Sequence, residues 1–166
     1  SIKHPMMEIF SEKSCAITFS FLDRFNQKDW DLEMISSLQL SSMLSGIVQN
    51  HCLVGLSHAI AHQLGQYVSH GLANALLMPS VIKHNSSDQK IHAQYTKLCN
   101  RSGIENLEKL VEIFEVLSAE HKKIPPIQES NFQNIARLAL LDPAARTNPV
   151  KFTESDIIKI LKRIYE

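Results

Sequence analysis

The sequence predicts an all-α protein, an antiparallel helical bundle, on three observations. Apolar residues recur at helical spacing along nearly the whole chain. Alternation of apolar and polar residues, which would indicate strands, never continues for more than a few positions. Only five glycines occur, and no Gly-rich phosphate-binding motif is present. Because the 166 residues contain no repeat and no linker, we expect residues 1–166 to form a single helical domain.

Two helices are predicted in the first third of the chain. The first spans roughly residues 5–25, and the residues of its apolar face are Phe10, Ile17, Phe21 and Phe25. Asp29 or Asp31 is suited to cap the second helix. The apolar residues of this second helix are Leu40, Met43, Leu44, Ile47 and Val48.

Three helices are predicted in the second half. Ser102 with Glu105 forms a capping-box pattern before a helix with an apolar stripe, and Ser130 with Gln133 forms another. Thr153 is expected to cap the last helix. The apolar stripes are Leu107, Leu110, Val111, Phe114 and Leu117 in the first of these helices, and Ile157, Ile160, Leu161 and Ile164 in the last. Pro125-Pro126 and Asp142-Pro143 indicate loops.

Charge and composition exclude several classes of function. The 17 Lys and Arg residues balance the 17 Asp and Glu residues, so no net field attracts nucleic acid or an anionic membrane. No apolar run reaches the ~18 residues that a membrane span needs. The three cysteines, Cys15, Cys52 and Cys99, match neither a disulfide framework nor a Cys-x-x-Cys ligand pattern. We therefore expect a cytoplasmic protein with no nucleic-acid or membrane partner.

The most informative feature is a group of histidines. His58 and His62 are four residues apart, which places both rings on one face of a helix, and Gly65 is expected to end that helix. His70 is expected near the next helix N-terminus, where helix polarity favours the neutral imidazole that a metal requires. The spacing suits two ligands of one ion, or one ligand and a neighbour. It also suits a purely structural helix pair, and it does not distinguish Fe, Zn, Co and Ni.

This region resembles the signature of the iron-containing (group III) alcohol dehydrogenases. The matching residues are His58-Ala-Ile-Ala-His62, Leu64-Gly65 and His70-Gly-Leu-Ala-Asn74-Ala-Leu-Leu-Met-Pro79. Flanking segments also resemble this family: Lys3-His4-Pro5, Ser42 to Gly46, Val54-Gly55-Leu56, Asp142 to Pro149 and Thr153 to Ile157. The resemblance covers essentially the whole chain. It implies the helical C-terminal, metal-binding domain of the dehydroquinate synthase-like/iron-dependent alcohol dehydrogenase fold.

The resemblance also implies roles for the histidines. An Asp and a His from one helix and two further histidines hold the ion in that family, and His58 and His70 match these two further ligands. His62 matches a catalytic histidine near the nicotinamide and the substrate. The implied metal is Fe²⁺, with Zn²⁺ as an alternative. The metal polarises the oxygen of a small alcohol or aldehyde while hydride passes to or from NAD or NADP. A homodimer is one expected assembly.

The sequence departs from the family pattern in two places. The Asp-x-x-x-His pair would lie upstream of His4, and the nucleotide-binding domain would also be N-terminal. The interval from His62 to His70 is shorter than usual, and Ser69 replaces a proline. Asp88 and His92 repeat the four-residue spacing, but we interpret them as a solvated helix face. With two of four ligands and no nucleotide domain, this segment is expected to be inactive alone.

Two other functions account for part of the pattern. A dehydroquinate synthase-like or glycerol dehydrogenase-like domain would also carry His-Gly after a histidine-bearing helix, as at His70-Gly71. A non-catalytic interaction module derived from the family would keep the helices and associate through an exposed apolar face. Metal analysis would distinguish a metal-binding dehydrogenase domain from the non-catalytic interaction module.

Overall fold

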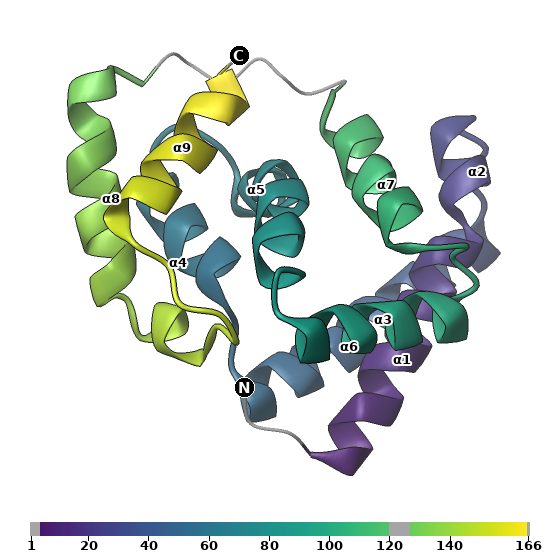
Figure 1. Cartoon of the computed structure of the whole chain (residues 1–166). Helices are drawn as coiled ribbons and strands as arrows, with labels where there is room; N and C mark the ends of the chain where they lie inside the picture. Colours follow the sequence, from purple (N-terminus) through teal and green to yellow (C-terminus); the bar gives the residue numbers. More distant parts are fainter. Residues whose placement is uncertain (1–3, 120–126, 166) are drawn as a thin grey trace. The chain divides into compact units, whose positions relative to one another are not determined.

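The computed structural model describes residues 4–119 and 127–165, and every regular element in these ranges is helical (Figure 1). The elements are α1 (Pro5–Ser20), α2 (Leu22–Asn26), α3 (Leu32–Cys52), α4 (Leu56–Gln63), α5 (His70–Asn85), α6 (Gln89–Ser102), α7 (Leu107–Ala119), η1 (Glu129–Asn131), α8 (Phe132–Leu141), η2 (Pro143–Thr147) and α9 (Glu154–Tyr165). The predicted all-α class is confirmed. None of the described helices is long and apolar enough to cross a membrane. The interruption predicted at Pro125-Pro126 lies outside the described residues.

The helices form two compact units. Unit 1 contains the chain up to Leu53 together with Ala93–Leu107. Unit 2 contains Val54–His92 and the chain from Glu108 onward. Helices α1, α2 and α3 belong to unit 1, and α4, α5, α8 and α9 belong to unit 2, so all three histidines of the predicted site lie in unit 2.

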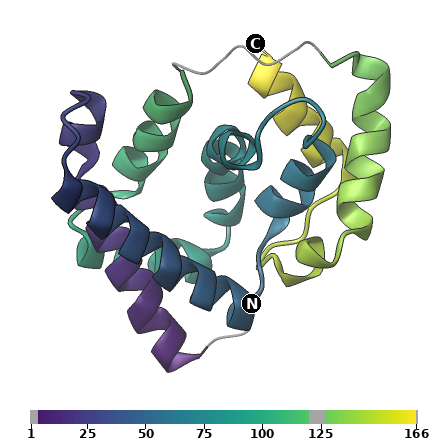
Figure 2. The same ribbon diagram turned by 180° about the vertical axis from the view of Figure 1, so that it is seen from behind.

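Hydroxyl groups form hydrogen bonds between α1 and α3, the two helices that lie side by side in unit 1 (Figure 2). The hydroxyl cluster consists of Ser14, Thr18, Ser41 and Ser45. Ser14 Oγ lies 2.8 Å from Ser41 Oγ and 2.6 Å from Ser45 Oγ, and Thr18 Oγ1 lies 2.7 Å from Ser41 Oγ. Ser41 also donates to the Ser14 carbonyl at 2.9 Å. Small polar side chains therefore form part of the interface between these helices, and their hydrogen bonds are satisfied locally.

The apolar faces predicted for the first two helices are wrong in part. The first helix ends at Ser20, because Phe21 leaves the helical conformation at φ −105° and ψ 5°. Phe25, Leu40 and Met43 are exposed. Packing uses the small hydroxyl residues instead, since these let the helix backbones approach without bulky side chains between them. Of the two predicted cap residues, Asp29 and Asp31, it is Asp31 that caps α3. Its carboxylate accepts a hydrogen bond from the Met34 N–H at 2.8 Å.

The core of unit 2 lies among α4, α5, α8 and α9. Helix α4 packs on α5 and α8, and α9 packs on α5 and α8. The largest buried side chains of this core include Leu56, Ile60, Leu77, Phe132, Ile135, Ile157 and Leu161. Burying each such side chain contributes about 1.5–3 kcal/mol. The apolar stripe predicted for the last helix is therefore correct.

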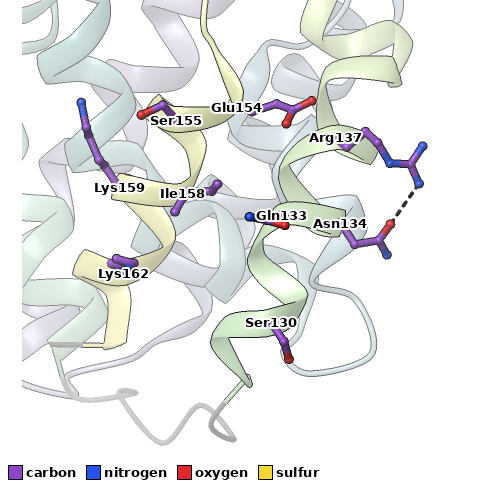
Figure 3. Close-up of a pocket in the computed structure, with 9 residues that line it drawn as sticks. All are labelled: Ser130, Gln133, Asn134, Arg137, Glu154, Ser155, Ile158, Lys159 and Lys162. Atoms are coloured by element: carbon purple, nitrogen blue, oxygen red, sulfur yellow. Dashed lines mark hydrogen bonds between the residues drawn. The ribbon is translucent and has the colours of Figure 1, made fainter.

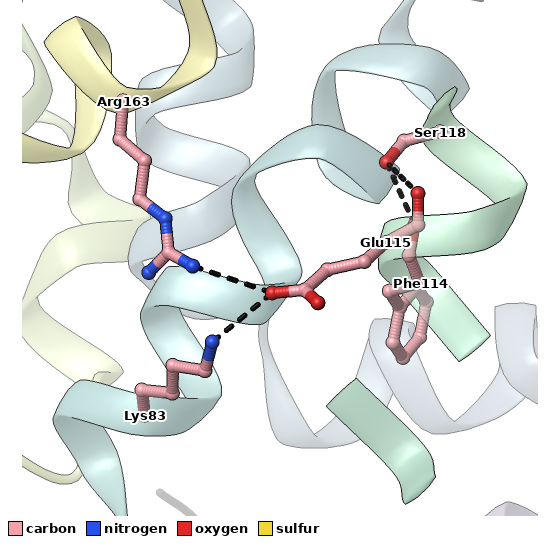
Figure 4. Close-up of polar contacts among 5 residues, drawn as sticks. All are labelled: Lys83, Phe114, Glu115, Ser118 and Arg163. Atoms are coloured by element: carbon pink, nitrogen blue, oxygen red, sulfur yellow. Dashed lines mark hydrogen bonds and ion pairs between the residues drawn. The ribbon is translucent and has the colours of Figure 1, made fainter. Parts of the chain in front are cut away.

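Helix α7 is tied to two other helices of unit 2 through Glu115 (Figure 4). The Glu115 carboxylate lies 3.0 Å from Lys83 Nζ on α5 and 3.3 Å from a guanidinium nitrogen of Arg163 on α9. All three side chains are about half exposed, so each pair is expected to contribute no more than about 1 kcal/mol. The ion pairs set the position of α7 more than they stabilise the core.

Neither predicted capping box begins a helix. Ser102 is the last residue of α6, and Gly103 follows it with φ 75°. The Ile104 N–H donates to the Cys99 carbonyl at 2.9 Å, which is the bond of a Schellman motif, so Ser-Gly ends a helix here. Ser130 lies inside η1, which runs directly into α8, so Asn131 occupies the cap position without a side-chain hydrogen bond.

Two further helix-boundary predictions have opposite outcomes. Thr153 does cap α9: the Asp156 N–H donates to its hydroxyl at 3.2 Å, and the Thr153 N–H donates to Asp156 at 3.0 Å. Pro79 stands within an apolar helical segment of the sequence, where a proline is predicted to kink or restart a helix, whereas α5 continues through it. The buried side chains Leu77 and Val81 on either side of the proline hold the helix in the core, and this burial offsets a cost of about 3 kcal/mol for an internal proline.

Candidate metal centre

The three histidines come from two helices of unit 2 that pack against each other. Helix α4 buries Leu56, Ala59 and Ile60 in the core, and it carries His58 half-buried and His62 exposed. It ends at Gln63, two residues before the predicted Gly65. His70 is the first residue of α5, as predicted, after a turn that brings the chain back towards α4.

The structure brings all three imidazole rings together. The ring centroids of His58 and His70 are 5.1 Å apart, those of His62 and His70 5.5 Å, and those of His58 and His62 6.5 Å. Two imidazoles that share one ion, with nitrogen atoms about 2.1 Å from it and ligand angles of about 90–110°, have centroids about 4.6–5.3 Å apart. Of the three pairs, only His58 and His70 fall in this range.

Electrostatics favour a neutral ring at His58. Burial lowers the pKa of His58, and the nearby His70 and His62 lower it further. A metal ligand must be neutral, so protons compete less with a cation at this ring than at a solvated histidine. The environment therefore fits a cation-binding role for His58.

Asn74 orients His70 from one helical turn further along α5. Its Nδ2 donates to the His70 carbonyl at 3.0 Å and lies 3.2 Å from His70 Nε2. An amide donor at Nε2 requires a lone pair on that nitrogen, which is the same lone pair that would bind a metal. The Oδ1 atom of Asn74 is buried and has no hydrogen-bond partner in the described chain, so an acceptor beside His70 is available to a further group.

His62 has a different partner from the other two rings. Its Nδ1 lies 2.9 Å from Oδ2 of Asp142, at the start of η2. Oδ1 of the same carboxylate accepts the Ala144 N–H at 2.8 Å. Burial raises the pKa of Asp142, but the hydrogen bonds from His62 and Ala144 outweigh this effect and hold the pKa below its usual value.

The segment around η2 also holds the start of α4. Asn148 Oδ1 accepts the Leu56 N–H at 3.3 Å, and the Thr147 hydroxyl donates to the Val54 carbonyl. A Cβ added to Gly55 would lie 3.1 Å from Asn148 Oδ1, so the glycine permits this close approach. Asn148 and Asp142 thus fix α4 near both of its ends.

Sequence reasoning missed the roles of Asp142 and Asn148. The sequence indicates only that they lie in the segment Asp142 to Pro149 that resembles the family, whereas each side chain contacts a residue 80 or more positions away. The one local signal was Asp142-Pro143, which also indicates a helix start. By contrast, Asp88 is the cap of α6, since its carboxylate accepts the N–H groups of Lys90 and Ile91. Both Asp88 and His92 are exposed.

The histidines do not make a complete metal site within the described residues. Across 4–119 and 127–165, no group of three or more His, Cys, Asp or Glu side chains has the geometry to hold a metal ion. His58 and His70 nevertheless suit two nitrogen ligands of one ion by their spacing and chemistry. The donor set therefore fits part of a metal site.

A separate surface groove lies between α8 and α9 in unit 2 (Figure 3). It encloses about 860 Å³ and contains Arg137, Lys159 and Lys162, but none of the three histidines lines it. Lys162 lies 3.3 Å from Glu129, and Arg137 donates to the neutral side chain of Asn134. The groove is thus distinct from the histidine site.

Comparison with known proteins identifies the family. Residues 2–165 match the C-terminal domain of the Fe-containing alcohol dehydrogenase family, and the chain belongs to that family. The resemblance noted in the sequence is therefore confirmed.

Individual relatives agree with this assignment. The chain is 30% identical over 132 residues to alcohol dehydrogenase 4 of Saccharomyces cerevisiae, covering 74% of this chain and 35% of that protein. It is 30% identical over 148 residues to 1,3-propanediol dehydrogenase of Klebsiella pneumoniae, covering 81% and 38%. The chain spans less than half the length of these relatives.

Solved structures share the fold. The iron-containing alcohol dehydrogenase of Thermococcus thioreducens superposes with a TM-score of 0.84 at 21% identity, over 98% of this chain and 44% of that one. A 1,3-propanediol oxidoreductase superposes with a TM-score of 0.79 at 26% identity, over 97% and 46%. The helical architecture of this chain is therefore that of the C-terminal part of these enzymes.

Proposed function

We propose that this chain is the metal-binding part of an NAD(P)-dependent alcohol dehydrogenase, with His58 and His70 as two of the metal ligands. The observation that carries the proposal is the 5.1 Å separation of these two rings, which sit on different helices. The proposed ion is Fe²⁺, with Zn²⁺ as an alternative, since imidazole suits both metals. The remaining ligands and the nucleotide site would come from outside residues 1–166.

The chain's own residues would divide the chemistry between them. When bound, the ion would polarise the oxygen of the substrate. His58 and His70 would hold the ion, and His62 would exchange a proton with the substrate or orient it. Relatives named for 1,3-propanediol, 1-propanol and butanol support a small alcohol or aldehyde as substrate. The proposal includes a cytoplasmic location and inactivity of this chain alone.

Metal uptake tests the proposal directly. We expect the chain, freed of metal and equilibrated with excess Zn²⁺ or anaerobic Fe²⁺, to retain metal when analysed by mass spectrometry. His58→Ala and His70→Ala should each lose most of it, because a single imidazole holds an ion poorly. His51→Ala is the matched control, since His51 lies exposed on α3 in unit 1 and should leave uptake unchanged.

The outcomes separate the competing functions. Absence of uptake, or uptake that is the same in all four proteins, would contradict the metal assignment and favour a non-catalytic helical module. Reduction of NAD or NADP by the isolated chain with 1-propanol would contradict the proposed inactivity. Thermal melting followed by circular dichroism would show whether each variant is folded.

A further inference from the structure

The contact between His62 and Asp142 joins the end of α4 to the start of η2, across 80 residues of sequence. The Asp142 side chain is only 16% exposed, whereas that of His62 is 47% exposed. The Ala144 N–H holds Oδ1 of the carboxylate at 2.8 Å, and this leaves Oδ2 directed at His62 Nδ1 at 2.9 Å. The backbone of η2 thus orients the carboxylate, and the carboxylate orients the more exposed imidazole.

We propose that Asp142 is a positioning residue that fixes His62 as the Nδ1–H tautomer and leaves Nε2 as the only proton acceptor of that ring. An ionised carboxylate accepts hydrogen bonds and donates none, so the proton of the 2.9 Å contact must be on Nδ1. In neutral imidazole the other nitrogen then carries the lone pair. This inference rests on the proposed function and adds to it a residue for which no role was predicted.

The three adjacent histidines differ in their spacing and in their partners. The His62 centroid lies 5.5 Å from that of His70 and 6.5 Å from that of His58, both beyond the range for rings that share an ion, whereas the His58–His70 distance of 5.1 Å is within it. Asp142 occupies Nδ1 of His62 and restricts the rotation of its ring. His58 and His70 make no such contact with a carboxylate within the described residues. His62 is therefore distinguished from the two proposed ligands by its ring spacing and by its carboxylate partner.

A role as a helix cap alone would not account for this geometry. A cap requires one carboxylate oxygen, and Oδ1 already meets the Ala144 N–H. The second oxygen could face solvent, as Asp88 and its exposed side chain at the start of α6 illustrate. Instead, Oδ2 of Asp142 pairs with the one histidine of the three that is expected to handle protons.

The tautomer of His62 is measurable in the metal-free chain. We expect long-range ¹H–¹⁵N spectra of ¹⁵N-histidine-labelled protein, recorded where the imidazoles are neutral, to show His62 protonated at Nδ1. The His62→Gln spectrum assigns the signals. In Asp142→Asn the amide oxygen should keep the Ala144 contact, so the NH₂ group would donate to Nδ1 and switch His62 to the Nε2–H tautomer. Asp156→Asn, at the cap of α9, is the control and should leave the tautomer of His62 unchanged.

The result decides the inference independently of the metal assignment. A wild-type His62 protonated mainly at Nε2, or an unchanged tautomer in a folded Asp142→Asn protein, would overturn it. If Asp142→Asn does not fold, the wild-type tautomer alone decides. Metal uptake without the expected tautomer would contradict only this inference, whereas the expected tautomer without metal uptake would contradict only the proposed function.

In enzyme reconstituted with its nucleotide-binding part, Asp142→Asn should lower kcat by about 10²–10⁴-fold while metal content is unchanged.

Discussion

Replacing Ile60 by alanine is expected to lower the free energy of unfolding by about 2–5 kcal/mol. Ile60 is fully buried among α4, α5, α8 and α9, and it lies on α4 between the two histidines of that helix. The substitution removes three carbon atoms from a close-packed core and leaves a cavity that the neighbouring helices fill only in part. Urea denaturation followed by circular dichroism measures the loss.

Two further substitutions make the Ile60 experiment specific. Ile60→Val removes a single methylene and should cost about 0.5–1.5 kcal/mol. Leu141→Ala removes a side chain that is 62% exposed and should have little effect. If Ile60→Ala cost no more than Leu141→Ala, the placement of this face of α4 in the core would be incorrect. Since α4 carries two of the three histidines, Ile60→Ala is also expected to weaken metal uptake.

Replacing Asn148 by alanine is expected to cost about 1–3 kcal/mol. Asn148 donates to Asn85 Oδ1 at 2.8 Å and to the Val150 carbonyl at 2.7 Å, and it accepts the Leu56 N–H. Asn85 is 3% exposed, so its Oδ1 would lose this hydrogen bond while it stays buried. The midpoint of urea denaturation reports this loss.

Asn148→Asp and Asn134→Ala test whether the loss of stability in Asn148→Ala comes from its hydrogen bonds. Asn148→Asp keeps the shape but presents a carboxylate to the oxygen atoms of Asn85 and Val150, so it should destabilise at least as much as alanine. Asn134→Ala removes an exposed asparagine on α8 and should change stability by less than about 0.5 kcal/mol. Equal effects at positions 134 and 148 would show that the Asn148 hydrogen bonds do not hold α4 in place.

Periodicity predicted the helices well where apolar side chains fill the core. Ile157 and Leu161 are fully buried on α9, as their spacing indicates. The same reasoning failed for α1 and α3, because serine and threonine, which pattern analysis treats as polar, form their interface. Capping patterns were ambiguous because Ser-Gly suits both ends of a helix, and only the positive φ of Gly103 determines which end is present.

The candidate site was predictable only as far as local sequence allows. Helical spacing and the family resemblance indicated His58, His62 and His70, and the structure brings their rings together. The partner of His62 was not predictable, because Asp142 lies 80 residues away and is near His62 only in a fold in which α8 packs against α4. Such a contact depends on the tertiary fold, and no periodicity in a single sequence encodes it.

The hydroxyl cluster between α1 and α3 affects how the two units respond to temperature. Exposure of apolar surface on unfolding raises the heat capacity, and exposure of polar surface lowers it. Among the described residues, the buried apolar side chains of unit 1 are few: Met7, Met34, Cys99, Ile104 and Leu107. Unit 1 should therefore have the smaller heat-capacity increment per residue and the flatter stability curve, while unit 2 loses more of its hydrophobic stabilisation on cooling.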